Sequence, residues 1–128
     1  MKDFRYKMIL SSINDLGWVI TEEDDNQGII VVNHCWNISL VDPQKIQFNI
    51  VCMEFEPSDA VKVELCVNVL NSVNKQIKLF AYQGIIIAAS EIETTSIMND
   101  SFSMTQVLGL INAEAVASAK SIHKLLVK

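Results

Sequence analysis

The sequence predicts an α+β domain in which helices pack on one mostly antiparallel sheet of about five strands. The chain has 128 residues, which is enough for one domain with its own core and too few for two. Half of the residues are hydrophobic, and there are only four glycines and two prolines. Apolar residues alternate with polar ones in several short segments and recur at helical spacing in three longer ones. The predicted order over residues 1–128 is α-β-β-β-α-β-β-α.

The first half of the chain is predicted to hold the first helix and most of the strands. Residues 3–17 place apolar side chains at helical spacing, and Gly17 is a plausible C-terminal stop. Strands follow at 18–21 and 29–40, the second with an irregularity near its middle and counted as one strand or two. A proline turn then leads into a strand at 46–55, where apolar and polar residues alternate.

The second half begins with a helix over 59–75, after a helix-start signal at Ser58 or Asp59. Its many valines make a strand the competing assignment, but its polar residues gather on one side of a helix. A tight Gln-Gly turn joins strands at 77–82 and 85–92. Ser103, with a glutamine three residues later, forms a capping box that opens an amphipathic helix over 104–127.

Charge and cysteine content limit the partners and the compartment. The formal net charge of −5 argues against a nucleic-acid backbone or an anionic membrane as partner. The longest apolar run, at 85–89, is far shorter than a membrane span, and the first residues contain no signal-peptide pattern. We therefore expect a cytoplasmic protein in which Cys35, Cys52 and Cys66 are reduced and packed as small apolar residues.

No segment carries a recognisable catalytic, cofactor or metal-binding pattern. The acidic turn at 22–28 could begin a calcium loop, but the closing carboxylate would fall on His34. His34 and Cys35 are neighbours on a predicted strand, so their side chains point to opposite faces. No phosphate-binding glycine motif and no paired zinc-ligand spacing occurs. The sequence therefore predicts no catalytic residue, no cofactor and no metal, and a protein that is not an enzyme.

The helix at 59–75 has more apolar surface than one sheet can cover. Its apolar residues occupy well over half of the circumference, whereas covering a sheet needs a stripe little more than 100° wide. Another helix or loop of the same chain could cover the remainder. We favour a subunit interface of a homodimer, with Leu65, Val69 and Val73 on the shared flank. The polar residues Glu64, Asn68 and Asn71 are expected to face solvent or to rim this interface.

The element order resembles the type III secretion chaperone-like fold, which the YbjN-like family of bacterial regulators shares. In the YbjN-like pattern a helix ends in a Leu-Asn-x-x-Asn sequence, here residues 70–74, and leads into a strand such as 77–82. A glycine turn, a second strand, a polar loop and a long amphipathic helix follow. The resemblance implies a small, acidic, cytoplasmic and dimeric protein, and it supplies no catalytic residues.

Two functions remain in competition from the sequence. The first is a non-enzymatic module, chaperone-like or regulatory, that binds another polypeptide. The second is a small-molecule-binding domain or an uncharacterised enzyme, with a pocket between the sheet and the helix at 104–127. Phe48, Phe80, Met104 and Leu108 would line that pocket, although each of them is equally compatible with a place in the core.

Overall fold

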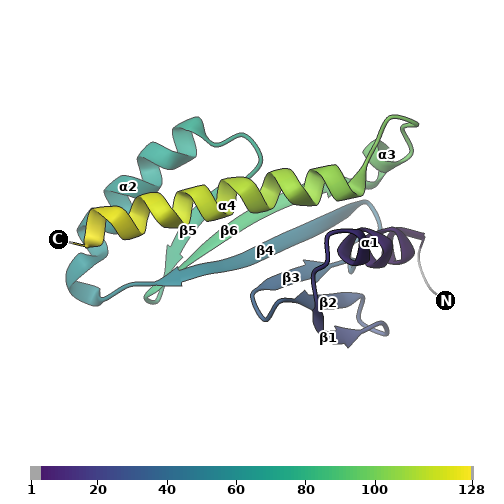
Figure 1. Cartoon of the computed structure of the whole chain (residues 1–128), viewed down its shortest axis with the longest axis horizontal. Helices are drawn as coiled ribbons and strands as arrows, with labels where there is room; N and C mark the ends of the chain where they lie inside the picture. Colours follow the sequence, from purple (N-terminus) through teal and green to yellow (C-terminus); the bar gives the residue numbers. More distant parts are fainter. Residues whose placement is uncertain (1–3, 128) are drawn as a thin grey trace.

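The computed structural model describes residues 4–127, which form an α+β structure on one antiparallel sheet (Figure 1). The elements are, in chain order, α1 (Phe4–Asp15), β1 (Ile20–Asp24), β2 (Ile29–Val32), β3 (Trp36–Ser39), β4 (Lys45–Glu54), the 3-10 turn η1 (Pro57–Asp59), α2 (Ala60–Val73), β5 (Lys78–Tyr82), β6 (Ile85–Glu93), α3 (Thr94–Ile97) and α4 (Met104–Leu126). The predicted fold class and order are confirmed, with six strands in place of about five.

The strands lie in the order β1-β2-β3-β4-β6-β5, and every neighbouring pair is antiparallel. The ten-residue strand β4 is central and pairs with β3 on one side and with β6 on the other. Gln83 and Gly84 both have positive φ, as a two-residue hairpin turn of type I′ requires. The strand β5 pairs only with β6 and so forms one edge of the sheet.

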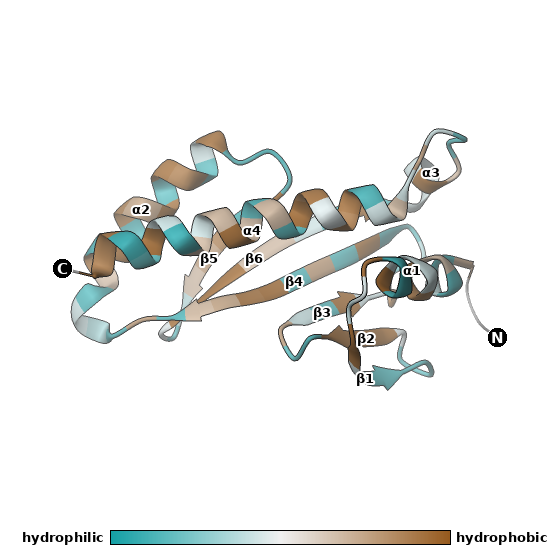
Figure 2. Ribbon diagram, viewed as in Figure 1, coloured by the Kyte–Doolittle hydropathy of each residue, from teal (hydrophilic) through white to brown (hydrophobic). Residues whose placement is uncertain are grey.

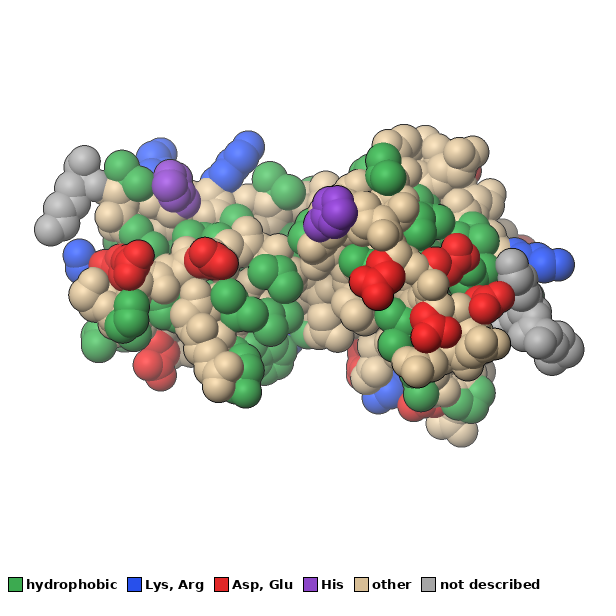
Figure 3. Space-filling view, turned by 90° about the horizontal axis from the view of Figure 1, so that it is seen from below, with side chains coloured by type: hydrophobic (Ala, Val, Ile, Leu, Met, Phe, Trp, Pro, Cys, Tyr) green, Lys and Arg blue, Asp and Glu red, His purple; other side chains and the backbone are tan. Residues whose placement is uncertain are grey.

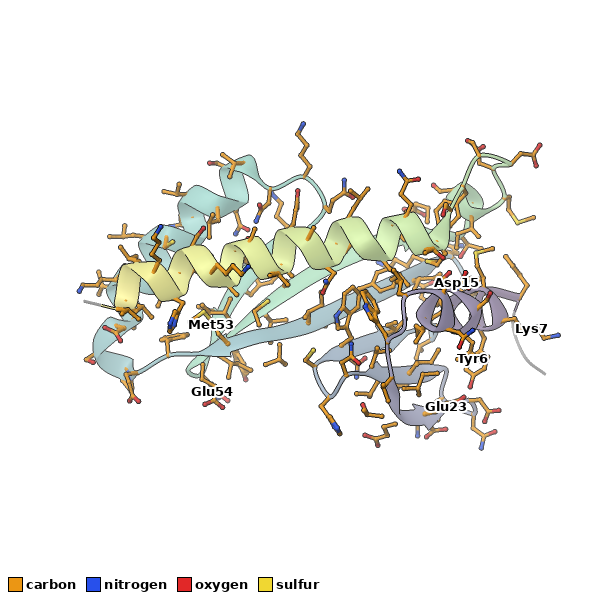
Figure 4. The ribbon with its side chains drawn as sticks, in the orientation of Figure 1. Tyr6, Lys7, Asp15, Glu23, Met53 and Glu54 are labelled. Atoms are coloured by element: carbon orange, nitrogen blue, oxygen red, sulfur yellow. The ribbon has the colours of Figure 1, made fainter. Side chains whose placement is uncertain are left out.

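One face of the sheet carries the helices, and the other face is open. Ile46, Phe48 and Ile50 of β4 are buried beneath the helices, whereas the alternate residues point to the open face. Figure 2 shows this alternation along β4, and Figure 4 shows Met53 and Glu54 on opposite sides of the strand. The long helix α4 runs along the sheet, with α1 near one end of it and α2 near the other (Figure 1).

The apolar stripe predicted on the last helix forms the centre of the core. Its buried members are Met104, Leu108, Ile111, Ala115 and Ile122. The helix begins as predicted, because the hydroxyl of Ser103 accepts a hydrogen bond from the backbone N–H of Gln106 at 3.2 Å. The stripe therefore joins sheet and helix layers over most of the length of α4.

A buried arginine fixes α1 against the sheet, and the sequence pattern gave no sign of it. The side chain of Arg5 is 2% exposed. Its guanidinium donates hydrogen bonds to the backbone oxygens of Leu40, Asp42 and Lys45 at 2.9–3.2 Å, and to the hydroxyl of Thr94 at 3.3 Å. One side chain thus ties α1 to the β3–β4 turn and to the start of α3.

Several predicted boundaries change. The segment 29–40 forms two strands, because residues 33–35 make a turn in which Asn33 and His34 take positive φ. The first strand begins at Ile20, two residues later than predicted, and extends into the predicted acidic turn. The predicted polar loop after β6 contains the short helix α3. Residue 3, which is predicted to lie in the first helix, falls outside the described residues.

Candidate functional site

The outward face of α2 is a continuous row of exposed apolar side chains, which we call the α2 stripe. Its members are Val61, Leu65, Val69 and Val73, with exposed fractions of 72%, 63%, 64% and 65%. They follow one another at intervals of four residues, so they lie on nearly the same side of the helix. No described element of the same chain covers the stripe, and the three residues predicted for the interface all belong to it.

The opposite face of α2 holds the helix on the molecule. Val63 and Val67 are buried, and Cys66 and Leu70 pack beside them against the core. Valine has a low intrinsic helix propensity, but this packing stabilises the helix in spite of its many valines. The predicted N-cap Asp59 occupies the N-cap position, but its side chain makes no capping hydrogen bond.

Asn71 was expected to face solvent or rim the interface; its amide does not point to solvent but binds β5, and a place at the rim of an interface stays a prediction. Its side-chain amide nitrogen donates to the backbone oxygen of Leu79 at 3.0 Å, and its side-chain oxygen accepts from the N–H of Leu79 at 2.7 Å. The amide thus imitates a neighbouring strand at the outer edge of β5. It fastens the C-terminal end of α2 to the sheet and pairs both backbone hydrogen-bonding groups of Leu79 at that edge.

A second fastening joins the α2–β5 loop to α4. The carboxylate of Glu114 accepts hydrogen bonds from the backbone N–H groups of Lys75, Gln76 and Ile77 at 2.8–3.2 Å. Nearby, the side-chain amide of Asn74 donates to the buried hydroxyl of Ser118 at 2.9 Å. These contacts keep α2 in one position, so the α2 stripe is presented on a fixed support.

Beside the stripe, an open groove of about 820 Å³ separates α2 from the edge strand β5. Its walls include Glu64 and Asn68 of α2 and Phe80 and Ala81 of β5. Phe80 continues onto the open face of the sheet. The wall formed by α2 is therefore mostly polar, and the wall formed by β5 adds the exposed Phe80.

The open face of the sheet is also apolar near β5. The register places Val51, Ile87 and Phe80 in one row across three strands, and Ile85 opposite Tyr82 in the next. Val51, Phe80 and Tyr82 are exposed, and the two isoleucines are half-buried. Figure 3 shows hydrophobic side chains over this end of the molecule and acidic ones gathered over the β1–β2 end. Exposed apolar surface is therefore concentrated at the end that carries α2 and β5.

The predicted pocket residues do not meet in one place. Phe48, Met104 and Leu108 are buried in the core, whereas Phe80 is exposed and lines a hollow of about 390 Å³ at the start of β5 that includes no residue of α4. A smaller cavity, of about 140 Å³, lies between β4 and α4 and is lined by Cys35 and Cys52 among others. The predicted location of a ligand pocket beneath the last helix is therefore wrong for these residues.

The described residues show no cluster of side chains suited to binding a metal ion. Residues 4–127 contain no group of three or more His, Cys, Asp or Glu that could hold a metal ion. His123 is exposed, and burial raises the pKa of the Cys35 and Cys52 thiols. Within the same residues, no helix is both long and apolar enough to cross a membrane.

Comparison with known proteins identifies the fold. No protein-family profile and no curated protein matches the sequence. The chain is similar to the crystal structure of YbjN from E. coli, described as a proposed transcription regulator, with a TM-score of 0.59 and 14% identity over 90% of this chain and 91% of that one. It is also similar to a chain of the heterodimeric ExoU–SpcU complex from the type III secretion system of Pseudomonas aeruginosa, with a TM-score of 0.55 and 14% identity over 93% and 98%. The predicted YbjN-like, type III secretion chaperone-like fold is confirmed.

Proposed function

We propose that this chain, as one domain, is a non-enzymatic protein-binding module, chaperone-like or regulatory, and that it forms a homodimer through the α2 stripe. The observation that carries the proposal is the row of four exposed apolar side chains on a helix whose other face is already packed. One fold neighbour supports a polypeptide partner, because it belongs to a heterodimeric complex. The net charge of −5 favours protein over nucleic acid, and a cytoplasmic location stays part of the proposal.

An antiparallel pair of α2 helices fits the stripe and its flanking charges. If a two-fold axis passes between Leu65 and Val69, each Leu65 meets the partner's Val69, so one patch serves both subunits. The same axis brings Asp59, before the helix, opposite the partner's Lys75, after it. A parallel pair would instead set like charges side by side. The charges at the two ends of the helix therefore favour the antiparallel arrangement.

The stripe alone is smaller than a stable interface usually requires. A standard interface buries roughly 800 Å² on each partner, which four side chains of this size do not supply. The groove between α2 and β5, with the exposed Phe80 in its wall, would complete the contact. We therefore place the interface on α2 together with the edge of β5.

The substitution Val69→Glu tests the dimer. A charge introduced at the centre of the interface would be buried without a partner, which costs several kcal/mol, so we expect a folded monomer by light scattering and circular dichroism. Val19→Glu is the matched control, because Val19 is similarly exposed at a distance from α2. A wild-type protein that is monomeric at high micromolar concentration would refute the homodimer.

The partner-binding role needs a separate measurement. We would capture proteins from native lysate with the wild type, with Val69→Glu and with Val19→Glu, and identify them by mass spectrometry. A polypeptide that is retained by the wild type and the Val19 variant supports the module. Failure to retain any polypeptide specifically, at several salt concentrations, would leave the homodimer intact and remove the binding function.

A small-molecule-binding role is the second candidate, and the hollow of about 390 Å³ at the start of β5 favours it. Its volume lies within the usual range for ligand pockets, and Lys75, Lys78 and Asn49 line it together with the exposed Phe80. A thermal-shift screen with metabolites would identify a saturating ligand by a raised unfolding midpoint. A clear metabolite response without any retained polypeptide would reverse the order of the two candidates.

A further inference from the structure

Two of the three cysteines lie at irregular points of neighbouring strands. Cys35 is the last residue of the turn between the paired residues Val32 and Trp36, so it stands outside the β2–β3 ladder. Cys52 is the extra residue of a β-bulge in β4, where the register with β6 shifts between residues 51 and 53. Bulges and turns change the direction in which a side chain points. In a regular strand, successive side chains point to opposite faces of the sheet. Neither Cys35 nor Cys52 lies in such a regular stretch, so this rule does not fix the face to which either side chain points.

These two irregularities bring the cysteines together beneath α4. The backbone N–H of Val51 donates to the oxygen of Cys35 at 2.9 Å, so the strand segments that carry the two cysteines are hydrogen-bonded neighbours. The register places Trp36 opposite Ile50 and hence Cys35 opposite Val51, so Cys52 directly follows the residue that faces Cys35. Both cysteines line the same cavity of about 140 Å³, against Ala115 and Ala119 of α4. Two cysteines that line one small cavity from neighbouring, hydrogen-bonded segments have the proximity that a disulfide requires.

We propose that Cys35 and Cys52 form an intramolecular disulfide when the chain meets a peroxide. Both thiols are free in the structure, so the bond has to be made by oxidation. In that reaction the two thiols lose two protons and two electrons, a sulfur–sulfur bond forms, and the oxygen–oxygen bond of hydrogen peroxide is reduced to two molecules of water. The bond closes a ring of about 18 residues that contains β3 and most of β4.

The surroundings of the pair make it a slow structural link and not a fast sensor. Burial raises the pKa of both thiols, and a charge on Cys35 raises the pKa of Cys52 further. Both groups are therefore protonated at neutral pH, and peroxide, which reacts with thiolates, attacks them slowly. Dithiols whose thiolates are not stabilised form disulfides that resist reduction. The link consequently accumulates during prolonged oxidation and persists afterwards.

The test is oxidation of the full chain with hydrogen peroxide, followed by mass spectrometry and thiol counting with a maleimide. We expect a mass loss of 2 Da, one remaining free thiol at Cys66, and a linked pair of peptides that contain residues 35 and 52. At pH values below the thiol pKa, the rate of disulfide formation should rise about tenfold for each unit by which the pH is increased. Thermal unfolding of the oxidised chain should occur several degrees higher than that of the reduced chain.

Variants separate this pair from the third cysteine. Cys35→Ser and Cys52→Ser should each abolish the 2 Da loss, whereas Cys66→Ser, on α2, should retain it. Circular dichroism of the reduced variants establishes that each is folded before oxidation. Three free thiols after prolonged oxidation at pH 9, sulfinic acid in place of a disulfide, or a linkage that involves Cys66 would each overturn the proposal.

Discussion

The helices α2 and α4 lie on the same face of one sheet, yet they use their apolar residues differently. The 23-residue α4 lies along the sheet between α1 and α2, and its apolar stripe is buried from Met104 to Ile122. The 14-residue α2 lies at the margin, next to the edge strand β5, and buries only Val63 and Val67. Apolar composition alone therefore does not decide whether a helical face belongs to the core. The number of neighbours that the topology places around the helix decides it.

The largest effect should come from truncating one leucine on each helix. Leu108 of α4 is fully buried, so Leu108→Ala should reduce the free energy of unfolding by about 2–5 kcal/mol through lost burial and a new cavity. Leu65 of α2 is exposed, so Leu65→Ala should change the unfolding of the single chain by less than about 0.5 kcal/mol. Urea denaturation at low protein concentration measures both values without the contribution of association.

Raising the protein concentration sharpens this contrast. If α2 forms the dimer interface, the stability of the wild type rises with concentration and that of Leu65→Ala rises less. The deficit of Leu108→Ala should stay nearly constant over the same range. Equal losses for the two variants at low concentration would mean that some part of the chain buries the α2 stripe, contrary to its exposure.

A smaller effect should follow when the fastening between the two helices is cut. The substitution Glu114→Ala removes the acceptor for three consecutive backbone N–H groups and should cost about 1–3 kcal/mol of unfolding free energy. Glu114→Gln keeps one carbonyl oxygen at the same place and should cost less. Because α2 would move more freely, hydrogen exchange should quicken at residues 75–77 before it does in β4.

Glu64→Ala provides the control for that experiment, because Glu64 is an exposed carboxylate on α2 outside this contact. We expect it to leave both the unfolding free energy and the exchange of residues 75–77 nearly unchanged. A loss as large as that of Glu114→Ala would show that overall charge, and not the hydrogen-bonded fastening, is responsible.

The sequence predicted those parts of the fold that depend on local periodicity. The stripe of α4, its Ser103 cap and the Gln83-Gly84 hairpin all follow from neighbouring residues, and the structure confirms them. The excess of apolar residues on the middle helix likewise follows from counting around its circumference. Exposure of Leu65 and Val69 agrees with that count, while their role in an interface stays a prediction.

The contacts that sequence reasoning missed leave no periodic signal in the sequence. Arg5 reaches backbone oxygens 35 to 40 residues away, and an arginine in a first helix ordinarily reads as a solvated charge. Asn71 is a residue type that usually lies on a polar surface. Only the position of β5 shows that its amide binds the backbone N–H and oxygen of Leu79 at the strand edge. The proximity of Cys35 and Cys52 depends on a turn and a bulge, neither of which has a periodic signal.

The smallest effect should be a pH dependence that arises under α4 and not on the exposed face of α2. Burial raises the pKa of Cys35 and Cys52 above the ordinary value of 9.0, so the folded state favours the neutral thiols. Their contribution to stability is complete below that ordinary value and is lost as the pH rises through the raised pKa values of the folded state. Under reducing conditions, the unfolding free energy of the wild type should therefore fall more steeply above pH 9 than that of a Cys35→Ala, Cys52→Ala double variant. The variant keeps every lysine and tyrosine of the wild type, so the difference between the two slopes isolates the thiols. Parallel slopes would mean that water reaches both thiols as freely as in the unfolded chain.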